Sequence, residues 1–435
     1  MTHPAPETGR SSVVGSSKPR LWKILGPGLI TGASDDDPSG IATYSQAGAQ
    51  FGYRMGWTLL VTYPLMVVVQ AMSARIGRTT GRGIAANLRE HYPNWILQSI
   101  VALLFAANTL NIGADLNAMA EAVRLVWPAA PAWAFVLFFG LICAGGQIFL
   151  KHTRYVSVLK WLTLSLFAYF AIIAVVRLPW QAVAKGLLIP SFTADGDFWT
   201  MAVAILGTTI SPYLFFWQAA QEVEDTKAHP QREPLLRKPS QAREALTRIR
   251  LDTLIGMALS NLVALAIMIT ASATLHASGH YQIESAAQAA EALRPIAGNA
   301  AFALFALGII GTGLLSVPVL AGSAAYALGE ARRWPVGLAR RPLEAKAFYG
   351  AIVVATFLGA VLTGSSINPV TALVWVAVVN AFVAIPVMGL LTVMTRSPKI
   401  MGAFRVSALW SALGWVTTAL MTAAAGLFVW STFHR

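Results

Sequence analysis

Apolar segments long enough to cross a lipid bilayer recur along almost the whole chain. A membrane-spanning helix needs about 20 predominantly apolar residues. Eleven such segments lie near residues 21–53, 55–76, 96–123, 133–150, 156–176, 199–221, 251–275, 296–328, 347–363, 371–394 and 404–431. Only 12% of the 435 residues are charged, whereas a soluble domain carries about 25%. The sequence therefore predicts an all-α polytopic membrane protein with about 11 transmembrane helices.

Positive charges are distributed unevenly among the loops that join these segments. When the N-terminus is placed in the cytoplasm, most of the 32 lysines and arginines fall on the cytoplasmic side, including the basic run at 227–250. This alternation is the positive-inside pattern of membrane proteins, and a nucleic-acid-binding surface would not produce it. We expect an integral protein of the plasma (inner) membrane, held in the lipid bilayer, with a cytoplasmic N-terminus and no nucleic-acid partner.

Three consecutive carboxylates interrupt the first apolar segment. Residues 31–40 read TGASDDDPSG, and the surrounding stretch 21–53 is too long for one comfortable span. Pro38 removes a backbone donor, and Gly40 tolerates unusual backbone angles. The sequence predicts two half-helices, about 21–34 and 41–53, joined by an unwound segment that is buried in protein or lines a watery cavity. A carboxylate at that depth costs about 2.5–3.5 kcal/mol on insertion scales, so it marks a functional site.

Asp35 and Asp36 allow two interpretations. They could face the pathway, where their charge would attract cations, or they could cap the second half-helix, since Asp is common near helix N-termini. The second half itself is too polar for a helix that faces lipid. Its polar residues, which indicate a water-lined face, are Thr43, Ser45, Gln46 and Gln50.

A second interruption falls in the sixth segment, where residues 207–212 read GTTISP. A single proline kink is common in membrane helices. Here, however, the two breaks are five spans apart, so a repeat of five spans would enter the membrane the other way up. Broken helices at corresponding positions of inverted halves point to the binding site of a transporter.

These breaks define the expected domain organisation. Residues 1–20 are polar and rich in Ser and Pro, and we expect a disordered cytoplasmic tail there. Residues 21–435 form a single transmembrane transporter domain in this prediction. Repeat one covers about 21–176, repeat two covers about 199–394, and an extra helix follows at 404–431.

Polar residues also cluster in the third span. Asn108, Asn111 and Asp115 are three and four residues apart and therefore share a helical face. Asp115 is a candidate proton or ion relay. Glu121, in the same span, lies near the outer surface, where it needs no special role. Asn380, in the tenth span, is a minor candidate for reaching the same cavity.

The motifs resemble those of the natural resistance-associated macrophage protein (NRAMP) family of divalent-metal transporters. The resemblance rests on GPGLITGASDDDPSG, the following SQAGAQFGY, GADLNAMAEAV in span three and GTTISP in span six. It implies a leucine-transporter-type fold with inverted five-helix repeats and broken helices 1 and 6. It also implies metal-ion uptake, often with proton cotransport.

The resemblance assigns the ligands residue by residue. In the family, the Asp and Asn of an Asp-Pro-Gly-Asn motif bind the metal with an Ala carbonyl and a Met from an Ala-x-x-Met-Pro-His motif. Asp37 matches the Asp, and Gly40 replaces the Asn. Thr208 stands at the Ala, Ser211 at the Met and Tyr213 at the His.

The proton route of the family is only partly matched. Asp115 matches its Asp, while Ala118 replaces a Glu. Asp115, Glu121 and Tyr213 remain the candidates for a proton or ion route.

Ligand chemistry favours a hard ion. A site made of Asp37, backbone carbonyls, Thr208, Thr209 and Ser211 contains only oxygen, which suits Mg²⁺, Ca²⁺ and Mn²⁺, whereas a thioether helps to select softer metals. Mg²⁺ keeps several of its waters, and the small residues Gly40 and Ser211 would leave room for them. We expect Mg²⁺ or Mn²⁺ as the transported substrate, and no cofactor.

Two other functions would use the same features of the sequence. An organic-solute and cation symporter could use the same broken helices. A membrane enzyme could use the three aspartates to bind a metal for phosphoryl or prenyl transfer, but it would need a second acidic cluster such as Asp-x-x-Asp, which the sequence lacks. The sequence also lacks the Gly-x4-Gly-Lys-Ser/Thr motif of an ATP-driven pump. We expect a secondary transporter, not an enzyme.

Overall fold

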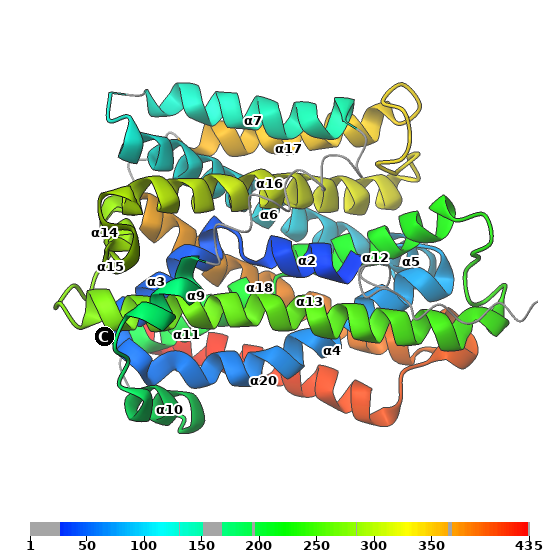
Figure 1. The fold of residues 1–435 in the computed structure, drawn as a ribbon. Coiled ribbons are helices and arrows are strands. Elements are labelled where there is room, and N and C mark those ends of the chain that lie inside the picture. Colours follow the sequence, from blue (N-terminus) through cyan, green and yellow to red (C-terminus); the bar gives the residue numbers. More distant parts are fainter. Residues whose placement is uncertain are drawn as a thin grey trace, which may run out of the picture.

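The chain folds into a bundle of long helices that run roughly side by side along the horizontal direction of Figure 1. The structure is a computed structural model, and it describes residues 27–129, 131–150, 168–193, 196–283, 285–363 and 368–433. No strand occurs within those ranges, which confirms the predicted all-α class. The expected tail at 1–20 lies outside the described residues.

The α-helices follow the predicted spans, with ends that shift by a few residues. They are α2 (Pro27–Asp35), α3 (Pro38–Phe51), α4 (Gly56–Thr80), α5 (Ile84–His91), α6 (Asn94–Val126), α7 (Ala132–Phe149), α9 (Ala168–Val175), α10 (Trp180–Leu188), α11 (Gly196–Thr209), α12 (Pro212–Ala228), α13 (Ala242–Ala271), α14 (Ala286–Glu291), α15 (Arg294–Ala297), α16 (Ala301–Arg332), α17 (Lys346–Leu362), α18 (Pro369–Arg396), α19 (Pro398–Met401) and α20 (Ala408–Phe433).

Eight helical segments in the described part of the chain are long and apolar enough to cross a membrane. α17 is also apolar but has only 17 residues. The predicted fifth span at 156–176 is described only from Ala168 onward, as α9. The predicted span at 296–328 begins later than expected, because the short α15 and a 3-10 turn at Gly298–Ala300 precede α16.

Both predicted breaks are present, but the first is shorter than expected. α2 ends at Asp35 and α3 begins at Pro38, so only Asp36 and Asp37 lie between the half-helices. Proline suits the first position of a helix, because its missing N–H would be unpaired there and its φ is already helical. The prediction that the second half starts near residue 41 was therefore wrong by about one turn. α12 likewise begins at a proline, Pro212.

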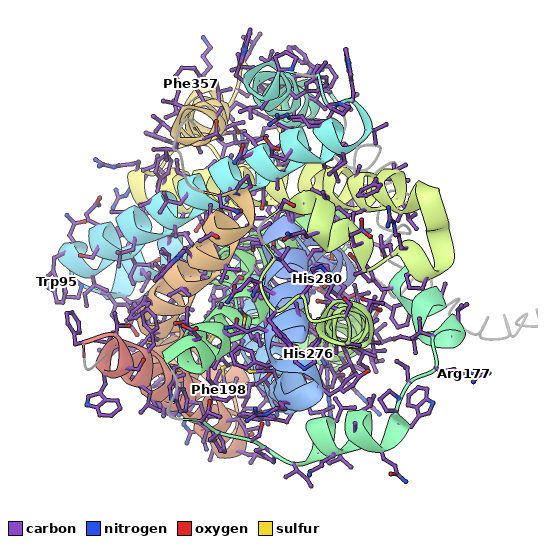
Figure 2. All side chains as sticks on the ribbon, turned by 90° about the vertical axis from the view of Figure 1, so that its left-hand side faces the viewer. Trp95, Arg177, Phe198, His276, His280 and Phe357 are labelled. Carbon is purple, nitrogen blue, oxygen red and sulfur yellow. The ribbon has the colours of Figure 1, made fainter. Side chains whose placement is uncertain are left out.

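The broken helices lie inside the bundle. α2 and α3 pack along α13, α11 packs along α18, and α12 packs along α4 and α16. The closest crossing is at Gly207 in α11, where a Cβ would come within 1.9 Å of the Ala377 carbonyl oxygen of α18. Only glycine permits that approach. Large apolar side chains such as Trp95 and Phe357, which are 70% and 60% exposed, lie at the perimeter of the bundle (Figure 2).

The basic loops meet at one end of the bundle, as the positive-inside pattern requires. Arg75 Nε donates to the Phe404 carbonyl at 2.8 Å. Arg78 donates to the Glu233 carbonyl, and Arg89 donates to the Glu330 carbonyl. These contacts join loops that lie far apart in the sequence, and all of those loops were predicted on the same side of the membrane.

Candidate metal-ion site

The two breaks place Asp37 and Ser211 at equivalent positions. Each is the N-cap of the second half-helix, each precedes a proline at the first helical position, and each has extended backbone angles. The last carbonyls of the first half-helices, on α2 and α11, have no partner further along their own helix. Such half-helix C-terminal ends and freed carbonyls are where transporters hold cations.

The carboxylate of Asp37 is buried, and only one of its two oxygens accepts short hydrogen bonds. Its Oδ1 accepts hydrogen bonds from the Ser39 hydroxyl at 2.6 Å and from the Gly40 N–H at 2.7 Å. Its Oδ2 has a long contact of 3.5 Å with the Tyr213 hydroxyl. Oδ1 therefore caps α3, while Oδ2 is the oxygen that remains for a ligand.

Tyr213 bridges the two breaks. Its side chain is fully buried on α12, and its hydroxyl donates to the Ser34 carbonyl at 3.0 Å, in the last turn of α2. The same hydroxyl faces Asp37. The residue that stands where the family has His is thus in contact with the proposed ligand.

Gly40 and Thr208 lie face to face across the two broken helices. A Cβ built on Gly40 would be 3.3 Å from Thr208 Oγ1 and 3.4 Å from the Asp35 carbonyl oxygen. Thr208 itself is buried, with 2% of its surface exposed. Asp37 Oδ2 and the Thr208 hydroxyl are therefore two buried oxygens close to the same pair of helix breaks.

Thr209 and Ser211 are already engaged with their own helix. Thr209 Oγ1 donates to the Ile205 carbonyl at 2.5 Å and lies 3.2 Å from the Tyr44 hydroxyl. Ser211 Oγ donates at 2.8 Å to the Gly207 carbonyl and shares its proton with the Thr208 carbonyl at 2.9 Å. Either hydroxyl would have to turn before it could bind an ion. The Thr208 carbonyl can still accept a ligand, since a carbonyl oxygen has two lone pairs.

Asp35 and Asp36 do not cap the second half-helix; Asp37 does. Both of their carboxylates instead contact Ser260 on α13, whose hydroxyl lies 2.6 Å from Asp35 Oδ2 and 3.3 Å from Asp36 Oδ1. The interpretation of Asp35 and Asp36 as caps is therefore wrong. Capping needs the residue directly before the first helical position, and Pro38 gives that place to Asp37.

The polar residues of α6 contact two neighbouring helices, α16 and α18. Asp115 Oδ2 accepts from the Ser316 hydroxyl of α16 at 2.8 Å, and its Oδ1 has no partner in the described residues. Asn111 donates to Asn380 Oδ1 of α18 at 2.9 Å, so the minor candidate Asn380 contacts this face. Glu121 is paired with Arg124 at 2.8 Å and is partly exposed. Glu121 is thus set apart from the buried carboxylates.

The C-terminal end of α3 is covered by a loop. Gln46 donates to the Tyr281 carbonyl at 3.2 Å and accepts from the Ile283 N–H at 2.9 Å. Beside this contact, Gln46 and Gln50 line a cavity of about 160 Å³ with residues of α11 and α18. The predicted water-lined face is thus only partly open, because Thr43 and Ser45 are buried. Figure 2 views this end, with His276 and His280 of the same loop near its centre.

Sequence reasoning missed the partners of the buried carboxylates. Ser260 and Ser316 occur singly in long apolar helices, where nothing in the local pattern separates them from serines that satisfy a carbonyl of their own helix. Only the packing of α13 against α2 and of α16 against α6 identifies them.

Comparisons with known proteins show the family to which the chain belongs. The family model described as "Natural resistance-associated macrophage protein-like" matches residues 28–431. A protein of Ralstonia nicotianae named divalent metal cation transporter MntH is 30% identical over 426 residues, covering 94% of this chain and 92% of the relative. A protein of the same name from Aeromonas hydrophila is 27% identical over 417 residues, covering 92% and 93%.

Solved structures share the fold at low sequence identity. A manganese transporter of Eremococcus coleocola matches with a TM-score of 0.74 and 20% identity, covering 94% of this chain and 87% of that chain. Mhp1, a nucleobase-cation-symport-1 family transporter, matches with a TM-score of 0.57 and 12% identity, covering 94% and 93%. The expected leucine-transporter-type fold with broken first and sixth helices is confirmed. Since the family model spans residues 28–431, the chain belongs to the natural resistance-associated macrophage protein-like family.

Proposed function

We propose that this chain transports hard divalent metal ions, Mg²⁺ or Mn²⁺, through a site between its two broken helices. The coarser function follows from the family: its members are divalent metal transporters and not enzymes, and the metal is their substrate and not a cofactor. The choice of ion is the part that the site residues support.

One observation carries the choice of ion. Asp37 Oδ2 has only a long contact of 3.5 Å with the Tyr213 hydroxyl, Thr208 Oγ1 lies beside Gly40, and Ser211 stands where a sulfur ligand would be. Free carbonyls of the last turns of α2 and α11 would complete an all-oxygen site. Oxygen ligands suit Mg²⁺ and Mn²⁺, and the structural neighbour from Eremococcus coleocola is a manganese transporter. The hydroxyls of Thr209 and Ser211 would turn toward the ion, and the space beside Gly40 would hold its waters.

Asp115 is the proposed proton carrier, if the transport is coupled to protons. It is buried, and its only hydrogen-bond partner in the described residues is Ser316. Tyr213 lies next to Asp37, and Glu121 lies toward the outer end. Asp35 and Asp36 would add negative potential near the ion.

The proposed topology places the basic end of the bundle in the cytoplasm. The plasma membrane is the proposed location, with a cytoplasmic N-terminal tail at 1–20. Two inverted repeats, about 21–176 and 199–394, are the proposed organisation of the transporter domain, with the helix at 404–431 added after them. The equivalent N-cap positions of Asp37 and Ser211 support it.

Uptake by the purified chain in liposomes tests the proposed function. The liposomes receive Mg²⁺, Mn²⁺, Ca²⁺ or Cd²⁺ with no organic solute, at two external pH values. We expect uptake of Mn²⁺ or Mg²⁺ that exceeds that of Cd²⁺. Uptake that requires an organic solute would instead establish the symporter alternative, and a preference for Cd²⁺ would refute the hard-ion site.

A further inference from the structure

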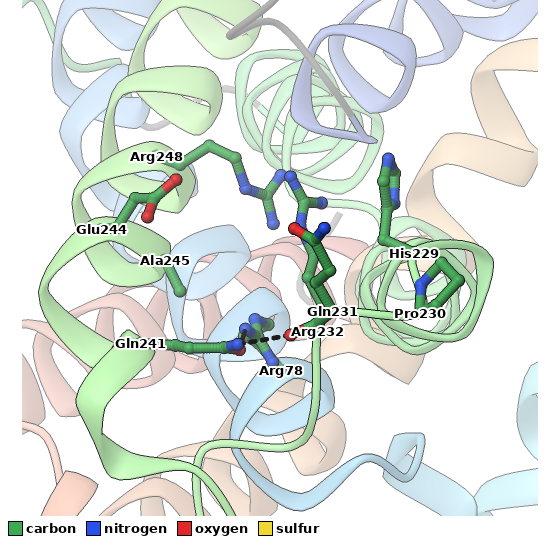
Figure 3. A pocket seen from close by; sticks show the side chains of 9 residues that line it. All are labelled: Arg78, His229, Pro230, Gln231, Arg232, Gln241, Glu244, Ala245 and Arg248. Atoms are coloured by element: carbon green, nitrogen blue, oxygen red, sulfur yellow. Dashed lines mark hydrogen bonds between the residues drawn. The ribbon is translucent and has the colours of Figure 1, made fainter. Parts of the chain in front are cut away.

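A second polar cavity lies at the basic end of the bundle, away from the broken-helix site. Its volume is about 490 Å³. It is enclosed by the end of α4, the start of α13 and the loop that joins α12 to α13 (Figure 3). Its lining residues are Arg78, His229, Pro230, Gln231, Arg232, Gln241, Glu244, Ala245 and Arg248.

Arg78 is the unusual member of this lining. Only 2% of its surface is exposed. Its guanidinium donates to the Glu233 carbonyl and, at 2.7 Å, to the Gln241 side-chain oxygen. Among the described residues, no carboxylate lies within ion-pair distance of it. Arg78 is therefore a buried cation with neutral partners only.

The other two arginines of the cavity are paired. Arg232 lies 2.5 Å from an oxygen of Asp225, and Arg248 lies 2.5 Å from an oxygen of Glu222. Arg248 also approaches Asp225 at 3.6 Å. Arg232 and Arg248 thus take the two nearby carboxylates as ion-pair partners, and Arg78 has no ion-pair partner of its own among the described residues.

Two further titratable groups line the cavity, and neither neutralises Arg78. Glu244 is exposed on the wall and forms no ion pair with any described residue. His229 lies at the end of α12, where its Nδ1 is 2.8 Å from the Asp225 carbonyl and 3.4 Å from the carboxylate. An anion that enters the cavity would therefore meet Arg78, Arg232 and Arg248 from three different elements.

Membrane topology alone does not explain this arrangement. The positive-inside rule requires only that basic residues stay on one side of the membrane, where exposed arginines serve equally well. A buried charge is costly unless it is paired. The geometry therefore points to a ligand that supplies the missing negative charge.

We propose that this cavity binds a phosphate-bearing anion. The planar guanidinium group matches phosphate oxygens with two parallel hydrogen bonds, which is why arginine dominates phosphate recognition. The cavity has room for a free phosphate compound or for the headgroup of an anionic lipid. The bound anion would tie α4 to the loop after α12 and to α13, and so brace the second half of the broken sixth helix.

The test measures binding directly and does not depend on transport. The full chain is purified in neutral detergent, and its thermal unfolding is followed by tryptophan fluorescence while sodium phosphate is titrated against sodium chloride of equal ionic strength. A ligand that binds only the folded state raises the melting temperature in a saturable way. A parallel series uses phosphatidylcholine nanodiscs with and without phosphatidic acid, which separates a lipid source from a soluble one.

Three variants identify the site. Arg78→Gln should raise the phosphate concentration needed for half-saturation by about tenfold or more, since hydrogen bonds to charged groups contribute about 1.5–3 kcal/mol. Arg243→Gln removes the same charge from an exposed position of α13 that does not line the cavity, and it should leave half-saturation within about twofold. Gln231→Glu places a carboxylate in the cavity with almost no change of shape, and it should raise the melting temperature without phosphate and remove the response to it.

The two series distinguish a soluble ligand from a lipid ligand. A response to free phosphate assigns the site to a soluble anion, and a response only to phosphatidic acid assigns it to a lipid headgroup. The proposal is overturned if neither phosphate nor phosphatidic acid gives a saturable rise in melting temperature. It is also overturned if the rise persists in both Arg78→Gln and Gln231→Glu, or if it is lost in Arg243→Gln. If Arg78→Gln does not fold, Gln231→Glu alone decides.

Discussion

The hydroxyl of Tyr213 lies 3.5 Å from Asp37 Oδ2 and donates to the Ser34 carbonyl at 3.0 Å. One side chain of the sixth span thereby contacts both the proposed ligand and the last turn of α2. A tyrosine hydroxyl ordinarily titrates near pH 10, whereas histidine titrates near pH 6.5. The group beside the proposed ion site therefore keeps a constant charge at neutral pH, unlike the histidine that the family has at this position.

Replacing Tyr213 with His should make ion binding depend on pH. Below about pH 6.5 the imidazole would carry a positive charge next to Asp37, and that charge would repel the metal. We expect the KM for Mn²⁺ uptake to rise about tenfold more between pH 7.5 and 5.5 than in the unmodified chain, since two charges about 4 Å apart interact by about 1–4 kcal/mol.

Tyr213→Phe is the matched control for that experiment. It removes the hydroxyl and adds no titratable group, so its pH profile should parallel that of the unmodified chain. Equal pH profiles for the His and Phe variants would show that position 213 does not sense the ion.

Asp37→Asn should abolish most transport without unfolding the protein. Asparagine is as good an N-cap as aspartate, so the bond to the Gly40 N–H can persist. The charge that holds the ion is lost, and we expect the apparent affinity for Mn²⁺ to fall by about tenfold or more, measured as uptake and by calorimetry.

Asp36→Asn removes the same charge one residue away, where the carboxylate contacts Ser260 instead of the site. Its affinity should stay within about threefold of the unmodified value. If Asp36→Asn is the more damaging change, the ion is bound on the α13 side, and Asp37 only caps its helix.

The sequence was sufficient for the all-α class and for the two breaks, because each depends on a local pattern: an apolar run, or a proline that interrupts it. Which of the three aspartates caps α3 and which contact α13 was not predictable from the sequence. These roles depend on a contact with Ser260, which is 225 residues from Asp35 in the sequence. The cavity around Arg78 was likewise hidden, because Arg78 is one of several arginines in a basic segment until the loop at 229–241 folds over it.

Gly207→Ala should destabilise the protein. A Cβ at this position would lie 1.9 Å from the Ala377 carbonyl oxygen, so α11 would have to move away from α18. Overpacking of this kind costs about 1–3 kcal/mol. The melting temperature of the purified protein should fall, and uptake should fall with it because α11 carries Thr208.

Gly426→Ala is the control for that substitution. Gly426 lies in α20, and a Cβ there would have no neighbour within 4 Å. Alanine is a better helix former by about 1 kcal/mol, so the melting temperature should stay constant or rise. Equal losses in both variants would mean that glycine is not needed for close packing at Gly207.

Ser211→Met should shift the ion preference toward soft metals. Ser211 occupies the N-cap position of the second half of the sixth span, and its hydroxyl lies 2.8 Å and 2.9 Å from the Gly207 and Thr208 carbonyl oxygens. Methionine would release both carbonyls and bring a thioether to the place where the family has one. Sulfur favours soft ions such as Cd²⁺, and the longer side chain would displace the waters that Mg²⁺ retains.

Ser211→Leu separates sulfur from size, because leucine and methionine have similar volumes. Leucine should weaken Mg²⁺ uptake about as much as methionine does, but it should not improve competition by Cd²⁺. Gly40→Asn combined with Ser211→Met should give the larger shift, since it restores a second side-chain ligand. The Asn Cβ would lie 3.3 Å from Thr208 Oγ1, so the threonine must move by a few tenths of an ångström to admit it. If Cd²⁺ competes equally well against Mn²⁺ in all three variants and in the unmodified chain, positions 40 and 211 do not set the ion preference, and the all-oxygen site does not explain selectivity.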